Sequence, residues 1–135
     1  MKKNLFYFIF LISSCQSGYE QKASKTECEK FKTGTFFHTS QGNPTRYRIE
    51  RNDSIQTEFI GKTGDYVNLK IIWTSPCSYE LTFLNQHIVK TDSFSNPAEF
   101  KKVKVEILNI RNDSCFVIAD NGIDRFRGVV YIDKR

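Results

Sequence analysis

The sequence predicts an all-β fold of about eight antiparallel strands in a meander, closed into a small barrel or packed as a sandwich, with one short helical turn. Apolar and polar residues alternate with a period of two along most of the chain beyond residue 30, as is typical of strands with one buried face. Turn-forming residues, including Asn-Asp pairs at 52–53 and 112–113, separate the alternating segments. Residues 28–135 number 108, enough for one core and too few for two.

Each strand is predicted from its own alternation, and the short turns between strands favour antiparallel pairing. Before the first Asn-Asp turn, Arg51 falls on the same face as Ile49. After it, we expect Phe59 to face the core, and Gln56 and Glu58 to face solvent. The predicted strands lie at residues 34–39, 46–51, 55–59, 67–73, 77–83, 102–110, 114–119 and 125–133.

One segment departs from the strand pattern in a helical way. Asn96 is a favourable N-cap, Pro97 suits the first helical position, and Glu99 follows the cap by three residues. The alternation resumes by Val103, so we expect one or two helical turns here.

The N-terminus has the three parts of an export signal in order: two lysines, the apolar run 5–12, and the small residues 13–14. As a helix, the apolar run would span only about 12 Å, well short of the roughly 30 Å hydrocarbon core of a bilayer. We therefore expect residues 1–14 to be a signal peptide that is removed, and not a membrane span.

The residues that end this signal, Ile-Ser-Ser-Cys at 12–15, resemble the lipobox of bacterial lipoproteins. The resemblance implies cleavage before Cys15 and acyl chains on that residue, and two or more chains anchor a protein stably. Gln16 is not the aspartate that retains some lipoproteins in the inner membrane, so an outer-membrane protein facing the periplasm is implied. Residues 15–27 would be the lipidated cysteine and a flexible tether, and residues 28–135 a single β domain.

Export permits disulfides among the three remaining cysteines. Cys28 precedes the first predicted strand and Cys77 begins another, so we favour a Cys28–Cys77 bridge. A bridge from either residue to Cys115, or no bridge, stays open. Cys115 lies in an apolar run, where a buried free thiol also fits. No cysteine or histidine spacing predicts a metal site.

The predicted strands contain five bulky aromatic residues that either fill the interior or line a ligand cavity. We favour a filled core, because a domain of this length has few large side chains to spare. These residues are Tyr47, Phe59, Trp73, Tyr79 and Phe83.

The stretch Phe-Lys-Thr-Gly-Thr-Phe-Phe at 31–37 resembles the opening strand of lipocalin-like proteins, with Gly34 and Phe36 at the positions of that family's Gly and Trp. In the family, an arginine near the last strand lies over the aromatic residue. The resemblance implies a meander barrel, in which Arg125 or Arg127 covers Phe36.

Three pairs of basic residues are predicted to point away from the core, and would form a basic patch if their strands were neighbours. Such a patch suits an anionic lipid surface or an envelope protein, while an ordinary solvated face is the other interpretation. Without Lys2 and Lys3 the net charge falls from +5 to +3, too mild to predict nucleic-acid binding. The six residues are Arg46, Arg48, Lys102, Lys104, Arg125 and Arg127.

No residue pattern predicts catalysis or a cofactor. His38 and His87 lie in separate segments, where we expect them at turns or facing solvent. Glu80 is expected to face solvent, an unsuitable setting for acid catalysis. The sequence contains no Gly-rich phosphate loop and no nucleophile elbow.

The chain also resembles a loose set of small Gram-negative envelope lipoproteins, some of which carry the label of a DNA topoisomerase IV subunit. That label does not fit, because strand passage needs a gate tyrosine beside an acidic metal site, or an ATP site, and the sequence shows neither. We expect a monomeric, lipid-anchored interaction or structural module of the envelope, without catalysis. The alternative is a binder of small hydrophobic ligands that uses the barrel interior.

Replacing Cys15 with alanine is expected to abolish metabolic labelling with palmitate, because the thiol of this residue accepts the lipid. Fluorography of labelled cells measures the incorporation, and Cys115→Ala is a matched control that should label normally. Undiminished labelling of the Cys15→Ala chain would contradict the lipoprotein prediction.

Overall fold

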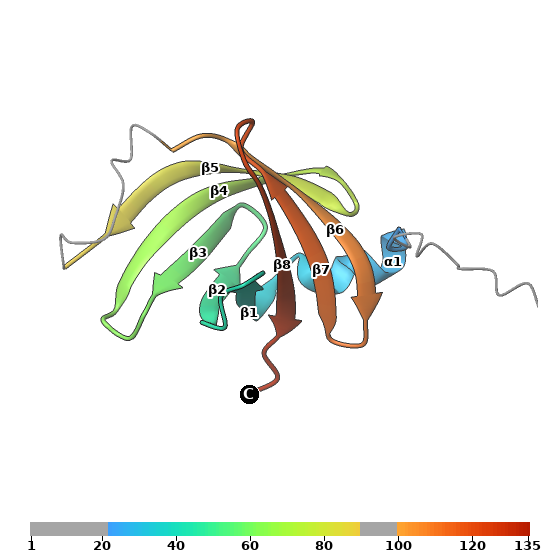
Figure 1. Ribbon diagram of the computed structural model, residues 1–135, viewed down its shortest axis with the longest axis horizontal. Coiled ribbons are helices and arrows are strands. Elements are labelled where there is room, and N and C mark those ends of the chain that lie inside the picture. The colour runs from blue at the N-terminus through green and yellow to red at the C-terminus, as the bar shows by residue number, and fades with distance from the viewer. Residues whose placement is uncertain (1–21, 90–99) are drawn as a thin grey trace, which may run out of the picture.

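The computed structural model describes residues 22–89 and 100–135, which form a closed eight-stranded barrel (Figure 1). The strands are β1 Gly34–Ser40, β2 Tyr47–Arg51, β3 Ile55–Ile60, β4 Asp65–Ser75, β5 Ser78–His87, β6 Val103–Arg111, β7 Ser114–Asp120 and β8 Arg125–Ile132. Each strand pairs antiparallel with the next along the chain, and β8 pairs with β1 to close the ring. The predicted meander barrel is confirmed, and the sandwich is excluded.

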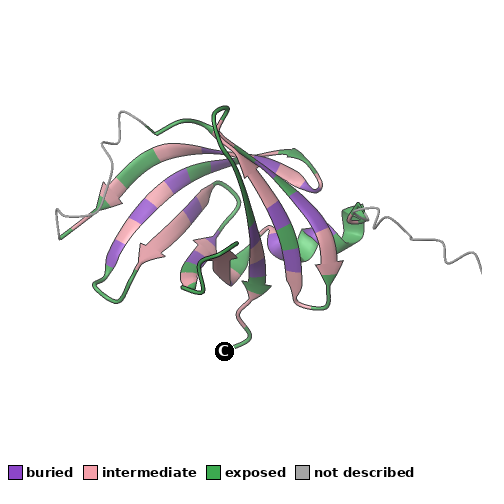
Figure 2. Cartoon of the chain, in the orientation of Figure 1, coloured by how far each residue is buried: buried purple, intermediate pink, exposed green. Residues whose placement is uncertain are grey.

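Side chains alternate between the interior and the outer surface, which Figure 2 shows as buried and exposed residues in turn along β6 and β7. Most strands contribute apolar side chains to the core, among them Phe36, Ile71, Leu81 and Ile107. Strand β3 is different, because its buried residue is the polar Gln56. The core is therefore apolar on most sides and polar along β3.

Strand β3 faces the opposite way from the sequence prediction. Gln56 is inside the barrel, and Phe59 is outside, where its ring lies 6.1 Å from that of Tyr66. Arg48 covers the same ring, with its guanidinium carbon 4.9 Å from the centroid. The prediction placed the more apolar set of side chains in the core. In the structure, the polar side chains of β3 instead point inwards, where they have hydrogen-bond partners, and Phe59 is covered on the outer surface.

A short helical segment plugs one end of the barrel. Ser24 begins it with a capping box: its hydroxyl accepts from the backbone N–H of Glu27, and the Glu27 carboxylate accepts from the backbone N–H of Ser24. The segment ends at Phe31, which is fully buried and stacks on Phe36 with ring centroids 6.1 Å apart. Its two parts are helix α1 (Lys25–Cys28) and the 3₁₀ helix η1 (Glu29–Phe31).

The folded domain includes residues that the sequence analysis assigned to the tether. Lys22 forms an isolated β-bridge with Leu108, and Ala23 packs against the core. Because α1 then begins at Lys25, the domain starts before the predicted boundary at Cys28.

The helical turn predicted at Asn96, Pro97 and Glu99 lies outside the described residues. The helical residues that the structure describes are those of α1 and η1. Over residues 22–89 and 100–135, no helix has the length and apolar character needed to cross a membrane.

Cys28 and Cys77 form the favoured disulfide, with Cα atoms 5.4 Å apart. The bridge fastens α1 to the turn between β4 and β5, and so holds the plug to the barrel wall. Cys115 on β7 is free and buried, which excludes the alternative pairings. Burial raises the pKa of its thiol to about 12.

The two Asn-Asp pairs form turns as predicted. The side chain of Asn52 accepts hydrogen bonds from the backbone N–H groups of Ser54 and Ile55. Asn112 has a φ of 51°, a left-handed conformation that asparagine tolerates better than most residues. These turns connect β2 to β3 and β6 to β7.

Replacing both Cys28 and Cys77 with serine is expected to lower the free energy of unfolding by about 4 kcal/mol, because the bridge closes a loop with a sequence separation of 49 residues. Urea denaturation of the wild type and the double variant measures the loss, and the reduced wild type should match the variant. A loss of less than about 1 kcal/mol would contradict a stabilising role for the bridge.

Candidate ligand-binding site

The interior of the barrel contains a partly open cavity of about 180 Å³ between the helical plug and the opposite end. The interior is therefore not completely filled by side chains, contrary to the expectation from chain length. An engineered cavity of roughly 150 Å³ can hold one benzene molecule, so the volume suits a ligand of about six to eight non-hydrogen atoms. Part of the wall is aliphatic and part is polar. The polar lining residues are His38, Arg51, Gln56, Glu58 and Tyr79.

Arg51, the last residue of β2, is the centre of this polar wall and is only 6% exposed. Its Nε donates to Gln56 Oε1 at 2.6 Å, and its Nη2 donates to the Tyr79 hydroxyl at 2.6 Å. Its Nη1 donates to the backbone carbonyl of Phe31 at 2.8 Å. The guanidinium carbon also lies 5.2 Å from the ring centroid of Phe36 and 4.7 Å from that of Tyr79. One side chain thus connects the plug to β1, β3 and β5.

Arg51 forms no ion pair with any described carboxylate. Its three acceptors are neutral, and Glu58 is linked to it only through Gln56, whose Nε2 donates to Glu58 Oε1 at 2.6 Å. Burial raises the pKa of the Glu58 carboxyl, and the Gln56 hydrogen bond and the Arg51 charge oppose that rise. The wall therefore has a buried cation next to an acid that is biased towards its neutral form.

His38 lines the cavity, so the prediction that it lies at a turn or faces solvent is wrong. Its ring passes over Gly128 of β8, where an added Cβ would lie 2.5 Å from His38 Nε2 and 2.7 Å from the carbonyl oxygen of Thr39. Burial lowers the pKa of His38, and Arg51 lowers it further, so the imidazole is held neutral. His87 is exposed on β5, as predicted, and its ring stacks on Tyr66.

The rest of the cavity wall is apolar and leads to the end of the barrel opposite the plug. Val103 and Ala119 line the cavity where β6 begins and β7 ends. Phe100 lines it just before β6, contacts Phe83 with ring centroids 6.2 Å apart, and is 38% exposed. We define the mouth of the cavity by Phe100, Val103 and Ala119.

The five aromatic residues predicted for the interior have different positions. Tyr79 is buried and lines the cavity, and Trp73 packs against it with ring centroids 4.8 Å apart. Phe83 packs against the core near the mouth, and Tyr47 is partly buried on β2. Phe59 lies outside the barrel. Only Tyr79 is among the described residues of the cavity wall.

The arginine that covers the aromatic residue of the first strand is Arg51 on β2. The resemblance to lipocalin-like proteins implied Arg125 or Arg127, but both are exposed, and Arg125 pairs with Asp120 at 3.6 Å. Phe36 is buried and stacks on Phe31 of the plug.

The six basic residues predicted to form a patch do not gather in one place. Arg46 precedes β2 and lies 5.9 Å from the ring centroid of Tyr131, while Arg48 on β2 pairs with Glu50. Arg127 is exposed on β8. Strand β1 separates β2 from β8, strand β7 separates β8 from β6, and strands β3, β4 and β5 separate β2 from β6 on the other side of the barrel.

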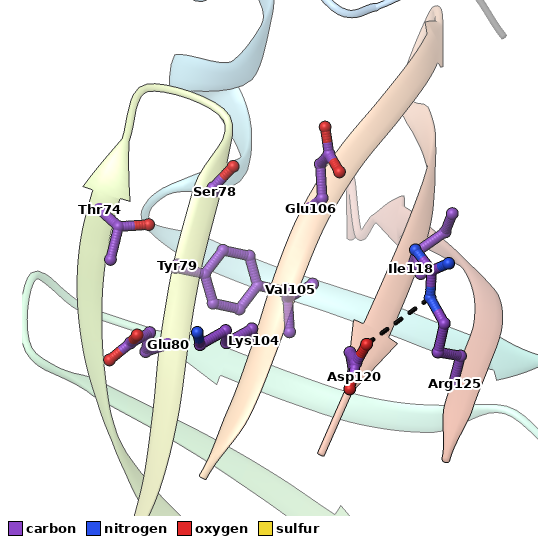
Figure 3. A pocket seen from close by; sticks show the side chains of 10 residues that line it. All are labelled: Thr74, Ser78, Tyr79, Glu80, Lys104, Val105, Glu106, Ile118, Asp120 and Arg125. Atoms are coloured by element: carbon purple, nitrogen blue, oxygen red, sulfur yellow. Dashed lines mark ion pairs between the residues drawn. The ribbon is translucent and has the colours of Figure 1, made fainter. Parts of the chain in front are cut away.

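The other basic residues belong to a row of alternating charges on the outer face (Figure 3). The row crosses four strands, because Glu80 pairs in register with Lys104, Lys104 with Asp120, and Asp120 with Arg125. Lys102 also binds Glu80, at 3.0 Å. The row lines a shallow depression of about 430 Å³, whose charges largely neutralise one another. This part of the outer surface therefore fits the interpretation of an ordinary solvated face.

Sequence reasoning missed the polar wall, although one signal was available. Alternation placed Arg51 on the inward face, and a buried arginine needs acceptors nearby. The polar residues Gln56 and Glu58, just beyond the turn, were the nearest candidates along the chain. Reading them as partners of Arg51 would have reversed the predicted face of β3.

The site has the chemistry of a binding site. It offers hydrogen-bond donors, one fixed positive charge and an apolar wall. Within the part of the chain that the structure describes, no group of three or more His, Cys, Asp or Glu residues could hold a metal ion.

Glu58→Gln is expected to stabilise the protein at neutral pH and to have little effect below about pH 4. The folded-state pKa of Glu58 is raised, so its ionisation destabilises the wild type as the pH rises above the ordinary value of 4.5. Urea denaturation at both pH values measures the effect, with Glu106→Gln on the outer face as the control. A Glu58→Gln effect of equal size at both pH values would contradict the raised pKa.

Comparisons with protein-family models, with curated proteins and with solved structures found no match to this chain. The cavity and its polar wall are therefore the evidence from which a function is inferred.

Proposed function

We propose that this protein is a lipid-anchored, non-catalytic binding protein of the cell envelope, whose barrel interior holds a small and mainly apolar ligand. The observation that carries the proposal is the cavity of about 180 Å³, aliphatic over much of its wall and polar at its base. Ligand sites are commonly apolar cavities with a few placed polar groups, and the mouths of barrels are a frequent location. The ligand-binding alternative from the sequence is thus favoured over a filled structural module.

The envelope location of this proposal rests on the N-terminal sequence. The two lysines, the apolar run 5–12 and Cys15 follow the order of a lipoprotein signal, which supports export and lipid attachment. The Cys28–Cys77 disulfide supports an oxidising compartment outside the cytoplasm.

Two observations support binding rather than catalysis. The described residues that line the cavity include no serine, threonine or cysteine that could act as a nucleophile. The free thiol, Cys115, is buried, and burial raises its pKa to about 12, so it is a poor nucleophile at neutral pH.

A second candidate, an interaction module of the envelope, is favoured by the outer face of β7, β8 and β1. Phe116 on β7 is 52% exposed, and Tyr131 on β8 is 39% exposed. Arg46 lies over Tyr131, and Arg135 lies over Phe37 with its guanidinium carbon 5.1 Å from the ring centroid. Aromatic residues and arginine are enriched at protein interfaces, so this face suits a protein partner.

Ala119→Phe is expected to abolish ligand binding, because the added ring would occupy the mouth of the cavity. Native mass spectrometry of the lipidated protein, released from detergent micelles in the instrument, should show a co-purified small molecule with the wild type and none with the variant. Ile118→Phe, one residue away on β7 and facing outwards, is the matched control and should retain the ligand.

The emission of Trp73 gives a second readout, because its ring contacts Tyr79 in the cavity wall. A small-molecule extract of the cell envelope should shift this emission in the wild type and not in Ala119→Phe. The absence of both a co-purified molecule and an emission shift would reject the cavity as the functional site and favour the interaction module.

A further inference from the structure

We infer that the ligand of the interior cavity is a short-chain carboxylate. Its anionic group would bind Arg51 and Tyr79 at the base of the cavity, and its apolar body of about three to five carbon atoms would extend towards Phe100. The inference rests on the proposed function and adds the chemical class of the ligand.

The base of the cavity has hydrogen-bond donors to spare. A guanidinium has five N–H groups, and Arg51 uses its nitrogens for three bonds to Phe31, Gln56 and Tyr79. The Tyr79 hydroxyl accepts one of these bonds, which leaves its own proton free to be donated. Because the Arg51 Nη2 and the Tyr79 oxygen are 2.6 Å apart, a single carboxylate can accept from both groups.

The charge at the base is not balanced by a direct partner among the described residues. A guanidinium that is 6% exposed has lost most of its hydration, and neutral acceptors replace only part of that loss. The other titratable groups of the lining are Glu58, Tyr79 and His38. Burial raises the pKa of Glu58 and Tyr79 and lowers that of His38, so all three are biased towards their neutral forms.

An anionic ligand would supply the missing counter-charge at this position. Hydrogen bonds between a guanidinium and a carboxylate are roughly twice as strong as those between neutral groups. A ligand with a neutral amide or hydroxyl in the same place could accept from the same donors but would supply no counter-charge. A ligand with an amine would place two positive charges together.

The rest of the cavity selects the body of the ligand. Between the base and the mouth, the wall is formed by aliphatic side chains of Ile49, Leu81, Val105 and Val117. These side chains have no hydrogen-bonding groups, so this section favours an unbranched hydrocarbon or a small ring. The volume of about 180 Å³ excludes the long chains of membrane lipids.

The test compares hexanoate, hexanamide and hexylamine, which share one carbon skeleton and differ in charge. Isothermal titration of the lipidated protein in detergent micelles at neutral pH measures each affinity, with protein-free micelles as the blank. Hexanoate is expected to bind at least about tenfold more tightly than hexanamide, and hexylamine is expected to bind most weakly.

Arg51→Met is expected to remove this preference, with at least a roughly tenfold loss for hexanoate and less than about a threefold change for hexanamide. Arg48→Met is the matched control, because Arg48 is on the same strand but faces outwards and should leave both affinities unchanged. If Arg51→Met does not fold, Tyr79→Phe keeps the buried ring and should weaken hexanoate more than hexanamide.

Equal affinities for hexanoate and hexanamide would overturn the carboxylate inference and leave the proposed function standing. Tighter binding of hexylamine would also overturn it and assign the cavity to cations. Failure of all three probes to bind, together with the absence of any co-purified molecule, would overturn the proposed function itself.

Discussion

The buried guanidinium of Arg51 is the interaction on which the architecture of this barrel depends. It binds the carbonyl of Phe31 in the plug, Gln56 on β3 and the hydroxyl of Tyr79 on β5, and it lies over the ring of Phe36 on β1. Each acceptor would be left unpaired without it, and an unpaired buried polar group costs about 1–3 kcal/mol. The charge that shapes the cavity therefore also holds the closed end together, so stability and binding depend on the same side chain.

The plug is held from two sides by different kinds of bond. The Cys28–Cys77 disulfide fixes α1 to the β4–β5 turn, and the hydrogen bond from Arg51 fixes the end of η1 to β2. Between these two links, the buried Phe31 stacks on Phe36 of β1. Side chains do not fill the interior of this barrel completely, and the plug closes the unfilled space at one end.

The parts of the structure that could be predicted from the sequence are those that depend on local pattern. Period-two alternation and turn chemistry are properties of neighbouring residues, so the strands, the Asn-Asp turns and the meander were predicted correctly. The disulfide followed from the placement of two cysteines at strand beginnings. Phe36 was placed at the position of a known barrel family's aromatic residue, because the stretch around it resembles that family's first strand.

The missed parts depend on contacts between residues that are distant in the sequence. Phe59 lies outside because Arg48 and Tyr66 cover it there, and Gln56 lies inside because Arg51 needs an acceptor. The pattern of hydrophobicity within β3 alone cannot reveal these contacts with other strands. The basic patch failed for a similar reason, because only the order of strands around the barrel determines which exposed charges meet. The cavity of about 180 Å³ is the small difference between the volume inside the barrel and the volume of the side chains that fill it. Amino-acid composition cannot predict a difference this small.

The plug and the mouth lie at opposite ends of the barrel, and this gives the molecule a direction. The described chain enters at the plugged end, where Lys22 pairs with Leu108 and α1 begins (Figure 1). The end of the domain that joins the N-terminal residues is therefore the end that the plug closes. The mouth lies at the far end, where the wall is formed by the start of β6 and the end of β7. Whatever the N-terminal residues attach to, the attachment and the opening use different ends of the barrel.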